Sequence, residues 1–158
     1  MAAIPPAHLL VDRQALTVLQ RVMAAARPAE GCALLLGSTG PSWRLQLVWP
    51  CLNCWPEPGE RGMRFALDPR EQLLAQRWAR QRGLQVLGCA HSHPRSAAVP
   101  SATDLALTLA PTLLLIEGQD LQWRGWWHGA DAAEPWELAL SSPENERPPQ
   151  RRDPAAGA

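Results

Sequence analysis

Short apolar runs separated by helix-like segments constrain the fold of this chain more than any other feature of its sequence. Residues 32–37 (CALLLG), 84–90 (LQVLGCA) and 112–118 (TLLLIEG) are nearly continuous apolar stretches of strand length. Such runs are typical of strands that are buried on both faces. Because helical patterns lie between them, the alternation favours an α/β domain with one mixed β-sheet flanked by helices.

Two helices have clear start and stop signals. Asp12 is placed to cap a helix that extends to about Ala26, and Pro28 blocks its continuation. Asp68 is placed to cap a second helix, which has proline at its first position and Gly83 as its stop. Both segments carry apolar residues at helical spacing, as helices that cover a sheet do.

Alternation and turn residues assign most of the remaining chain. Residues 31–49 predict a hairpin around the turn STGPS, and the Pro- and Gly-rich residues 50–63 predict a surface loop. We expect a short helix at 105–110 and two further strands at 121–128 and 136–140. The eight tryptophans, three of them in the first of these strands, are expected to fill the core and edge strands, because alternate residues of a strand bury only one set.

Length and C-terminal composition bound the domain. A chain of 158 residues is long enough to bury one core without disulfides or a structural metal. Residues 141–158 contain four prolines and almost no large apolar side chain, so they cannot offset the entropy cost of ordering. We therefore expect one folded domain over residues 1–140 and a disordered tail over 141–158.

The charge balance and the N-terminal residues exclude several classes of partner. Fifteen acidic and fifteen basic residues give a formal net charge of zero, so no global field attracts nucleic acid or an anionic membrane. The first residues lack the basic start and long apolar run of a signal peptide or membrane anchor, so the cytoplasm is the expected location. The four cysteines are therefore expected to be reduced and packed as small apolar side chains; they are Cys32, Cys51, Cys54 and Cys89.

The stretch GCAHSHPRSAAVPSATD, residues 88–104, holds the residues that carry chemistry. His91 and His93 are two apart where an apolar strand ends, so in extended geometry both imidazoles point to the same side. Asp104 could add a carboxylate. Three such ligands leave the fourth tetrahedral position to water, which is the arrangement of a catalytic zinc site.

From the residues alone, this stretch could also be a strand end followed by a capped helix, with no metal. Ser101 with an acidic residue three positions later is a capping box for a helix. Two histidines at a strand end also serve many roles other than metal binding. The HxH pattern therefore does not decide between a metal site and a capped helix.

A wider set of residues resembles the JAMM (MPN+, Mov34-type) zinc metalloprotease family. Its signature is a glutamate, then HxHP, then Ser and Asp, and Glu30, His91, His93, Ser101 and Asp104 fill these positions with the family's spacing. The resemblance extends to an Asn in the long loop, to RFALDP before the second helix and to PSATD, and it covers nearly everything except the tail. It implies a JAMM/cytidine-deaminase-like fold.

The resemblance also implies a role for each residue. His91, His93 and Asp104 would hold Zn²⁺, Glu30 would take a proton from water and pass it to the leaving amine, and Ser101 would hydrogen-bond the oxyanion. A carboxylate beside a zinc site is a competent base, and a donor placed where charge develops lowers the barrier. Ala33 and the pair Cys89-Ala90 depart from common family residues, and none of them is a ligand. A form without insertions resembles the bacterial branch.

Two other interpretations compete with this one. The motif PCLNC, residues 50–54, matches half of the zinc deaminase signature, but the HxE half should come first and position 93 is His. A catalytically inactive MPN-type binding module is the second alternative, although such modules lack ligands that this chain keeps. Cys51 and Cys54 have no second CxxC pair to complete a zinc site.

The sequence thus predicts a zinc-dependent metallopeptidase or isopeptidase of the JAMM type. By the resemblance, its substrate is an amide bond after the C-terminal Gly-Gly tail of a ubiquitin-like or sulfur-carrier protein. Release of an amino acid such as cysteine from that tail is the first expectation, and processing of an extended precursor is the second. The oligomeric state, and whether the isolated protein is active without a partner, stay open.

Overall fold

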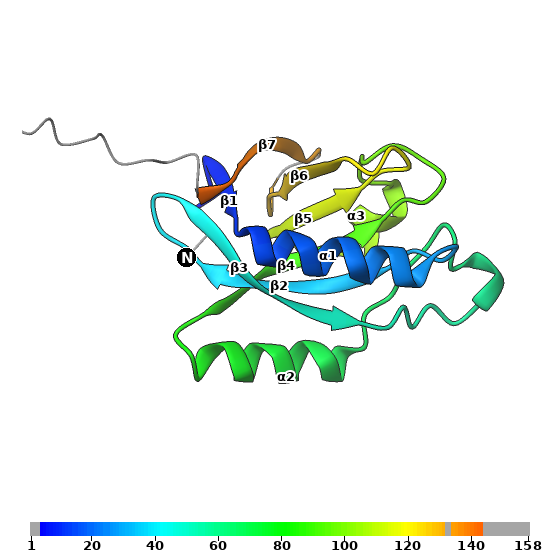
Figure 1. The fold of residues 1–158 in the computed structure, drawn as a ribbon, viewed down its shortest axis with the longest axis horizontal. Helices are drawn as coiled ribbons and strands as arrows, with labels where there is room; N and C mark the ends of the chain where they lie inside the picture. Colours follow the sequence, from blue (N-terminus) through cyan, green and yellow to red (C-terminus); the bar gives the residue numbers. More distant parts are fainter. Residues whose placement is uncertain (1–3, 132–133, 144–158) are drawn as a thin grey trace, which may run out of the picture.

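Seven strands form one sheet that closes on itself in the computed structural model, which describes residues 4–131 and 134–143 (Figure 1). The order around the barrel is β1-β3-β2-β4-β5-β6-β7. The strands are β1 (His8–Val11), β2 (Cys32–Ser38), β3 (Trp43–Cys51), β4 (Gln85–Ser92), β5 (Thr112–Glu117), β6 (Trp123–His128) and β7 (Trp136–Ser141). The sheet is mixed: β4 pairs with β5 in parallel, β1 is parallel to both its neighbours, and the other pairs are antiparallel.

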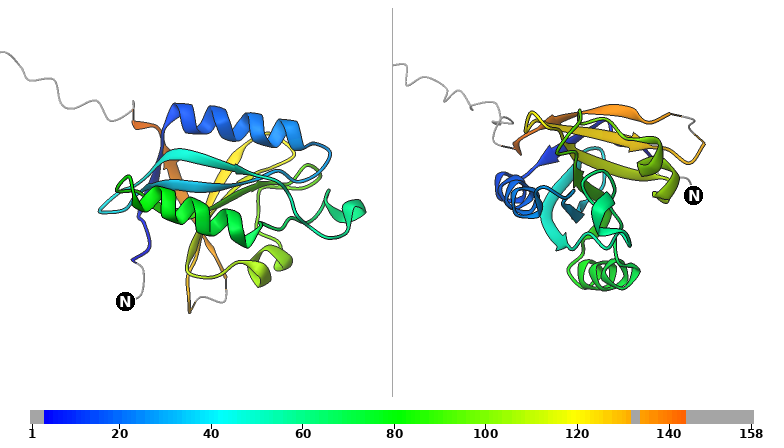
Figure 2. Two further views of the ribbon diagram at one scale, coloured as in Figure 1. Left: turned by 90° about the horizontal axis from the view of Figure 1, so that it is seen from below. Right: turned by 90° about the vertical axis from the view of Figure 1, so that its right-hand side faces the viewer.

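Two helices cover opposite faces of the β2–β4 region (Figures 1 and 2). Helix α1 (Arg13–Ala26) packs beside the barrel interior, whereas α2 (Pro69–Arg80) packs on the outer face. The alternation of β2 explains both contacts, because Leu35 points to the α1 side and its neighbours Leu34 and Leu36 point to the α2 side. Two short helical segments, η1 (Pro58–Glu60) and α3 (Ala102–Leu107), lie in the connections.

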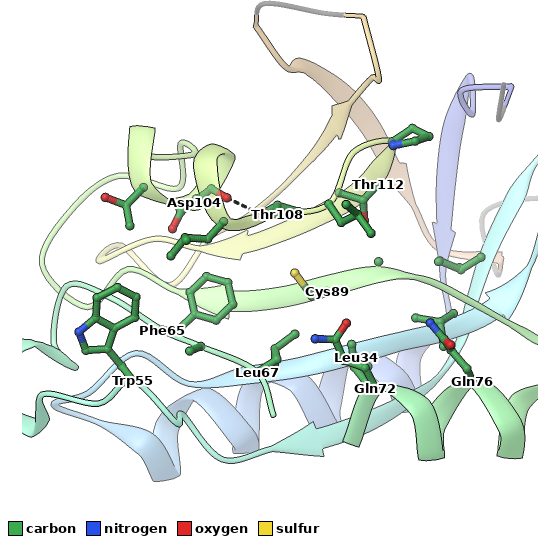
Figure 3. A pocket seen from close by; sticks show the side chains of 18 of the residues that line it. Leu34, Trp55, Phe65, Leu67, Gln72, Gln76, Cys89, Asp104, Thr108 and Thr112 are labelled. Atoms are coloured by element: carbon green, nitrogen blue, oxygen red, sulfur yellow. Dashed lines mark hydrogen bonds between the residues drawn. The ribbon is translucent and has the colours of Figure 1, made fainter. Parts of the chain in front are cut away.

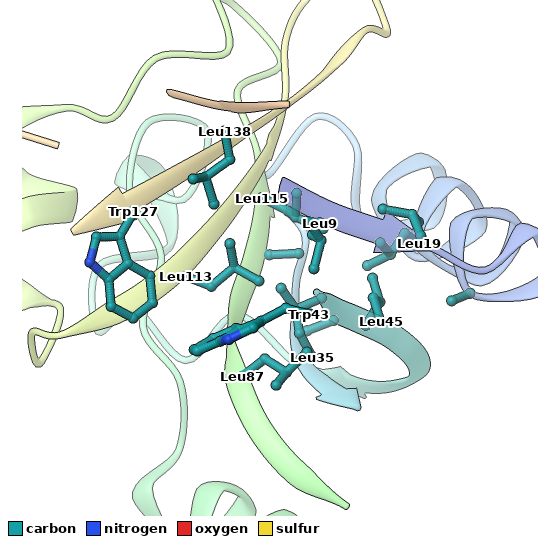
Figure 4. Packing of buried hydrophobic residues seen from close by; sticks show 14 of the residues in the cluster. Leu9, Leu19, Leu35, Trp43, Leu45, Leu87, Leu113, Leu115, Trp127 and Leu138 are labelled. Carbon is teal, nitrogen blue, oxygen red and sulfur yellow. The ribbon is translucent and has the colours of Figure 1, made fainter. Parts of the chain in front are cut away.

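The main core fills the barrel and the space under α1 (Figure 4). Leu35, Leu113 and Leu115 come from the central strands and are almost completely buried. Trp43 and Trp127 meet edge to face with their ring centroids 5.3 Å apart. These two tryptophans are buried, as expected for core filling, and the close-up shows them among the leucines of the barrel.

The expected hairpin and the two long helices are confirmed. Helix α2 begins as predicted, with the Asp68 carboxylate accepting a hydrogen bond from the Arg70 amide at 2.9 Å. Helix α1 has the predicted bounds, but the Asp12 side chain makes no capping bond. Its carboxylate accepts a hydrogen bond from Arg44 Nε at 2.8 Å instead, which ties the helix start to β3.

Three expectations need correction. Strand β1 was not predicted, because its four residues are too few to show a period and only three of them pair on each side. That strand joins β3 to β7, so the expected mixed sheet also closes into a barrel, which the sequence did not predict. Strand β3 extends to Cys51, so the irregular loop begins later, and α3 begins at Ala102 rather than 105.

The last strand ends at Ser141, one residue beyond the expected end of the domain. The tail predicted for residues 141–158 lies outside the described residues from 144 onward. Among the described helices, none is long and apolar enough to cross a membrane.

Candidate metal centre

The two histidines stand at the end of β4 and point to the same side of the strand. His91 pairs with Cys32 of β2 and Ile116 of β5, so its side chain is completely buried, and His93 is 5% exposed. Their Nε2 atoms are 2.9 Å apart. The period of two that the sequence suggested therefore brings both rings together.

Asp104 reaches the same point from the first turn of α3. Its Oδ2 atom lies 3.1 Å from the Nε2 atoms of both His91 and His93. The same oxygen accepts a hydrogen bond from the Ser101 amide at 2.8 Å. The capping box that starts α3 thus also fixes the direction of the carboxylate toward the histidines.

A bound cation explains the close approach of these three atoms better than hydrogen bonds among them do. Each neutral imidazole Nε2 has at most one proton to donate, and an ionised carboxylate has none, so at most two of the three contacts can be hydrogen bonds. The hydrogen bonds from His91 and His93 keep the pKa of Asp104 well below its usual range despite its burial, so the carboxylate is ionised. In a tetrahedral zinc site, with ligands at about 2.0–2.1 Å, ligand atoms are separated by roughly 3.3 Å. The observed distances of 2.9 and 3.1 Å among His91 Nε2, His93 Nε2 and Asp104 Oδ2 are close to that separation, and we call these three atoms the triangle.

Glu30 lies beside this triangle in the turn between α1 and β2. One of its carboxylate oxygens, a ring nitrogen of each of His91 and His93, and a carboxylate oxygen of Asp104 all lie within 4.8 Å of one another. The side chain is 3% exposed, and its Oε2 has no hydrogen-bond partner in the described part of the chain. A buried carboxylate oxygen without a partner is costly, so this geometry indicates a place for water or another polar group.

Burial also shifts the proton affinity of Glu30. It raises the pKa to about 7, with His93 opposing the shift and the charge of Asp104 adding to it. A carboxyl group with a pKa near neutrality can both accept and donate a proton at physiological pH. The sequence signature placed a glutamate here, and the fold supplies the environment that would suit it for acid–base chemistry.

Asn53 holds the main chain of Glu30 from the long loop. Its side-chain amide donates to the carbonyl oxygens of Glu30 at 3.0 Å and Arg64 at 2.9 Å. Its side-chain oxygen accepts from the amides of Trp55 and Ala66. With all four bonds made, Asn53 ties the otherwise irregular loop to the turn before β2.

Two more residues of the site were not found by sequence reasoning. Ser92 lies between the two histidines and points to the other side of β4, where its Oγ accepts a hydrogen bond from the Gly31 amide at 2.9 Å. Phe65 stacks on His91 with ring centroids 4.3 Å apart. Alternation along β4 was a signal for Ser92, whereas nothing in the local sequence pairs Phe65 with His91.

The environments of the two imidazoles differ. Burial lowers the pKa of His91, and its hydrogen bond to Asp104 only partly opposes this. Burial acts in the same direction on His93, but bonds to Asp104 and to the Ala97 carbonyl raise its pKa overall. His93 Nδ1 lies 2.8 Å from that carbonyl oxygen, a contact that orients the ring with Nε2 toward the triangle.

Ser101 stands at the exposed rim of the site. Its Oγ accepts a hydrogen bond from the Asp104 amide at 3.0 Å. An accepting hydroxyl keeps its own proton, which it can donate to a further group. Ser101 thus caps α3 and still has a hydroxyl proton to donate to a further group.

A cavity of about 720 Å³ leads to the site (Figure 3). It lies between α2, which contributes Gln72 and Gln76, and the segment from α3 to β5. Trp55 and Phe65 line it on the loop side, and Asp104 belongs to its wall. The cavity is a long, mainly apolar groove on the surface, and it borders one side of the candidate metal centre at Asp104.

The cysteines take no part in this cluster. Cys32 and Cys89 are buried, Cys51 is half-buried, Cys54 is exposed, and all four are free thiols. Burial raises the pKa of Cys51 to about 11 and that of Cys89 to about 12, so both stay protonated. Within residues 4–131 and 134–143, Glu30, His91, His93 and Asp104 are the group that could hold a metal ion, which leaves the deaminase-like PCLNC motif without a metal site.

A profile of the prokaryotic homologs of the JAB domain matches residues 13–138. The chain belongs to the JAB/MPN family. The resemblance to the JAMM family is thereby confirmed. A desampylase of Pyrococcus furiosus is 28% identical over 119 residues, which are 75% of this chain and 79% of the relative.

Solved structures share the fold of this chain. A protein of Desulfitobacterium hafniense, solved in solution, matches with a TM-score of 0.74 at 28% identity over 85% of this chain and 92% of that one. One from Salinibacter ruber matches with a TM-score of 0.62 at 27% identity, over 88% and 94% of the two chains. A JAB1/MPN domain protein from Archaeoglobus fulgidus, 20% identical, shares the fold with a TM-score of 0.53 over 85% and 98%.

Proposed function

We propose that this protein is a zinc-dependent JAMM-type isopeptidase that hydrolyses the amide bond after the Gly-Gly tail of a ubiquitin-like or sulfur-carrier protein. The observation that carries the proposal is the unpartnered carboxylate oxygen of Glu30, buried beside the triangle of His91, His93 and Asp104. That arrangement supplies a base next to three ligands with one coordination position left over. Similarity to a desampylase supports a ubiquitin-like substrate.

The residues divide the work of hydrolysis. A zinc ion held by His91, His93 and Asp104 would activate water and polarise the scissile carbonyl. Glu30 takes a proton from the attacking water and delivers it to the leaving nitrogen; in the metal-free protein its burial already raises its pKa to about 7, within the range useful for proton exchange. Ser101 donates its hydroxyl proton to the oxygen on which negative charge develops.

The groove supports an extended substrate tail. It runs from Asp104 along β4 between α2 and the α3–β5 connection, and its walls are mainly apolar. A peptide must lie extended to present one amide bond to a metal centre, and a groove of this kind holds it. We place the tail before the scissile bond in this groove, and the leaving group on the side of Glu30, which is not part of the groove wall.

Intact mass spectrometry of a cleavage reaction tests this function. The zinc-loaded protein is incubated with a ubiquitin-like protein whose Gly-Gly tail carries, in separate reactions, a single cysteine, a short peptide extension or an isopeptide-linked lysine peptide. We expect cleavage after the second glycine of at least one substrate, and none with Glu30→Gln. Zinc-loaded protein that binds the tail and cleaves none of the three would instead be an inactive MPN-type binding module.

A further inference from the structure

A partly buried ion pair joins two segments that are far apart in the sequence and adjacent to the site. Arg27 Nη2 donates to Glu117 Oε1 at 3.0 Å, across 90 residues of chain. The Glu117 side chain is 4% exposed and that of Arg27 is 42% exposed. The carboxylate is therefore held inside the protein at the end of β5, and the guanidinium reaches it from the rim.

Each member of the pair is connected to a residue of the candidate metal centre, Arg27 along the chain and Glu117 through a hydrogen bond. Arg27 follows the last residue of α1 and precedes Glu30 by three residues in the turn that leads to β2. The main-chain carbonyl of Glu117 accepts a hydrogen bond from the His93 amide at 2.7 Å. The pair thus links the segment that carries the base to the segment that carries a ligand.

Ser92 closes this link into a ring. Its Oγ accepts from the Gly31 amide at 2.9 Å, and its own amide donates to the Gly31 carbonyl at 3.1 Å. The ring runs along the chain from Arg27 to Gly31 and then through hydrogen bonds to Ser92. It continues along the chain to His93, and hydrogen bonds connect His93 to Glu117 and Glu117 back to Arg27. Glu30 lies on one side of this ring and His93 on the other.

The chemistry of the pair suits positioning more than stability. Burial raises the pKa of Glu117, and the hydrogen bond and charge of Arg27 oppose that rise. An ion pair with one buried member contributes little net stability, because desolvation of the Glu117 carboxylate cancels much of the attraction. What an ion pair adds is a hydrogen bond of fixed direction and length between two segments.

We propose that the Arg27–Glu117 ion pair is a positioning pair that sets the separation between the Glu30 carboxylate and the triangle of His91, His93 and Asp104. The pair touches neither the substrate nor the ligand atoms and acts through the main chain on either side. This inference rests on the proposed function of Glu30 as the base. Displacements of about 1 Å at reacting groups can lower turnover by roughly a hundredfold, so the pair would control the rate strongly.

Four variants and two measurements test the pair. Arg27→Gln removes the charge, Arg27→Lys keeps it, and Arg27→Gln with Glu117→Gln removes both charges so that no buried carboxylate is left unpaired. Arg124→Gln is the control, because Arg124 makes an exposed ion pair with Glu137 between β6 and β7, and neither residue belongs to the group that could hold a metal among the described residues. Steady-state kinetics give kcat and KM, and hydrogen exchange of the zinc-free protein reports the Gly31 amide.

We expect Arg27→Gln and the double variant to lower kcat by roughly ten- to a hundredfold while KM stays within about twofold, because tail binding is untouched. The Gly31 amide should exchange faster in both without zinc, and Arg27→Lys should restore most of kcat. Arg124→Gln should match the wild type. A double variant with wild-type kcat, or with unchanged exchange at Gly31, overturns the inference.

The proposed function fails in a different way. If the wild-type protein cleaves no Gly-Gly substrate, Glu30 is not a base and the positioning role falls with it, whatever the exchange data show. If the wild type cleaves and the double variant cleaves equally well, the isopeptidase stands and the Arg27–Glu117 pair is an ordinary structural contact.

Discussion

Ser101 and Asp104 exchange two hydrogen bonds, and the carboxylate oxygen that accepts from Ser101 is the same oxygen that faces both histidines. Asp104 Oδ2 accepts from the Ser101 amide at 2.8 Å and lies 3.1 Å from each Nε2. The capping box of α3 and the candidate metal centre therefore share one carboxylate. The two interpretations that the sequence left open for this stretch are both satisfied by a single carboxylate.

This shared geometry predicts a separable effect for Ser101→Ala. Loss of the cap to the Asp104 amide should cost about 1 kcal/mol of unfolding free energy. Loss of an oxyanion donor should lower kcat by roughly a hundredfold or more. Thermal unfolding and turnover at saturating substrate measure the two effects. A variant that loses stability and keeps its turnover number would assign Ser101 to the cap alone.

Zinc content tests the triangle directly. The purified protein should contain about one zinc per chain, since two His, one Asp and a water complete the usual tetrahedral count. His93→Ala should lose most of that zinc, because two ligands hold the ion much more weakly. His128→Ala is the matched control, since this histidine is half-buried in β6 and belongs to no metal group among the described residues. Elemental analysis that finds full zinc in His93→Ala would show the ligand assignment to be wrong.

Local signals predicted the parts of this structure that depend on neighbours in sequence. Asp68, Pro69 and Gly83 mark the bounds of α2 to within a few residues, because caps and breakers act over one turn. The alternation at the end of β4 correctly placed His91 and His93 on one side of the strand. These features need no knowledge of the rest of the fold.

Contacts between distant segments could not be predicted in the same way. Closure of the barrel depends on β1 pairing with β7, whose residues His8 and Ala139 meet from opposite ends of the chain. The bond from Ser92 to Gly31 and the ion pair of Arg27 with Glu117 likewise join segments with no shared local pattern. Only the arrangement in space reveals which polar side chains hold the base.

The buried carboxyl of Glu30 predicts a pH dependence of stability in the zinc-free protein. Burial raises its pKa from 4.5 to about 7, so the folded state binds this proton more tightly than the unfolded state does. The resulting stabilisation is complete below pH 4.5 and is lost as the pH rises toward 7. Glu30→Gln does not titrate, so the wild type should lose stability relative to it across this window.

Calorimetry of both proteins in chelator measures this difference. Titrating groups that do not interact with Glu30 cancel when the wild type is compared with Glu30→Gln at each pH, whereas His93, whose pKa the Glu30 charge helps to raise, adds to the difference. We expect the two melting temperatures to diverge from pH 4.5 to 7 and to keep a constant separation above it. A constant difference over the whole range would mean that Glu30 is solvated or paired in solution.

The groove beside Asp104 predicts a strict requirement at the last residue of the substrate tail. Phe65 lies in the groove wall and also stacks on His91, so a tail in this groove would pass the Phe65 ring next to a ligand. A β-branched side chain at that point would meet the ring, whereas glycine passes it with the backbone extended. Replacing the terminal Gly of the tail with Val should therefore abolish cleavage, and Phe65→Ala should restore part of it. Competition binding provides the control, because a tail that stays bound and uncleaved locates the block at the scissile bond. Equal cleavage rates for the Gly and Val tails would mean that the substrate does not approach through this groove.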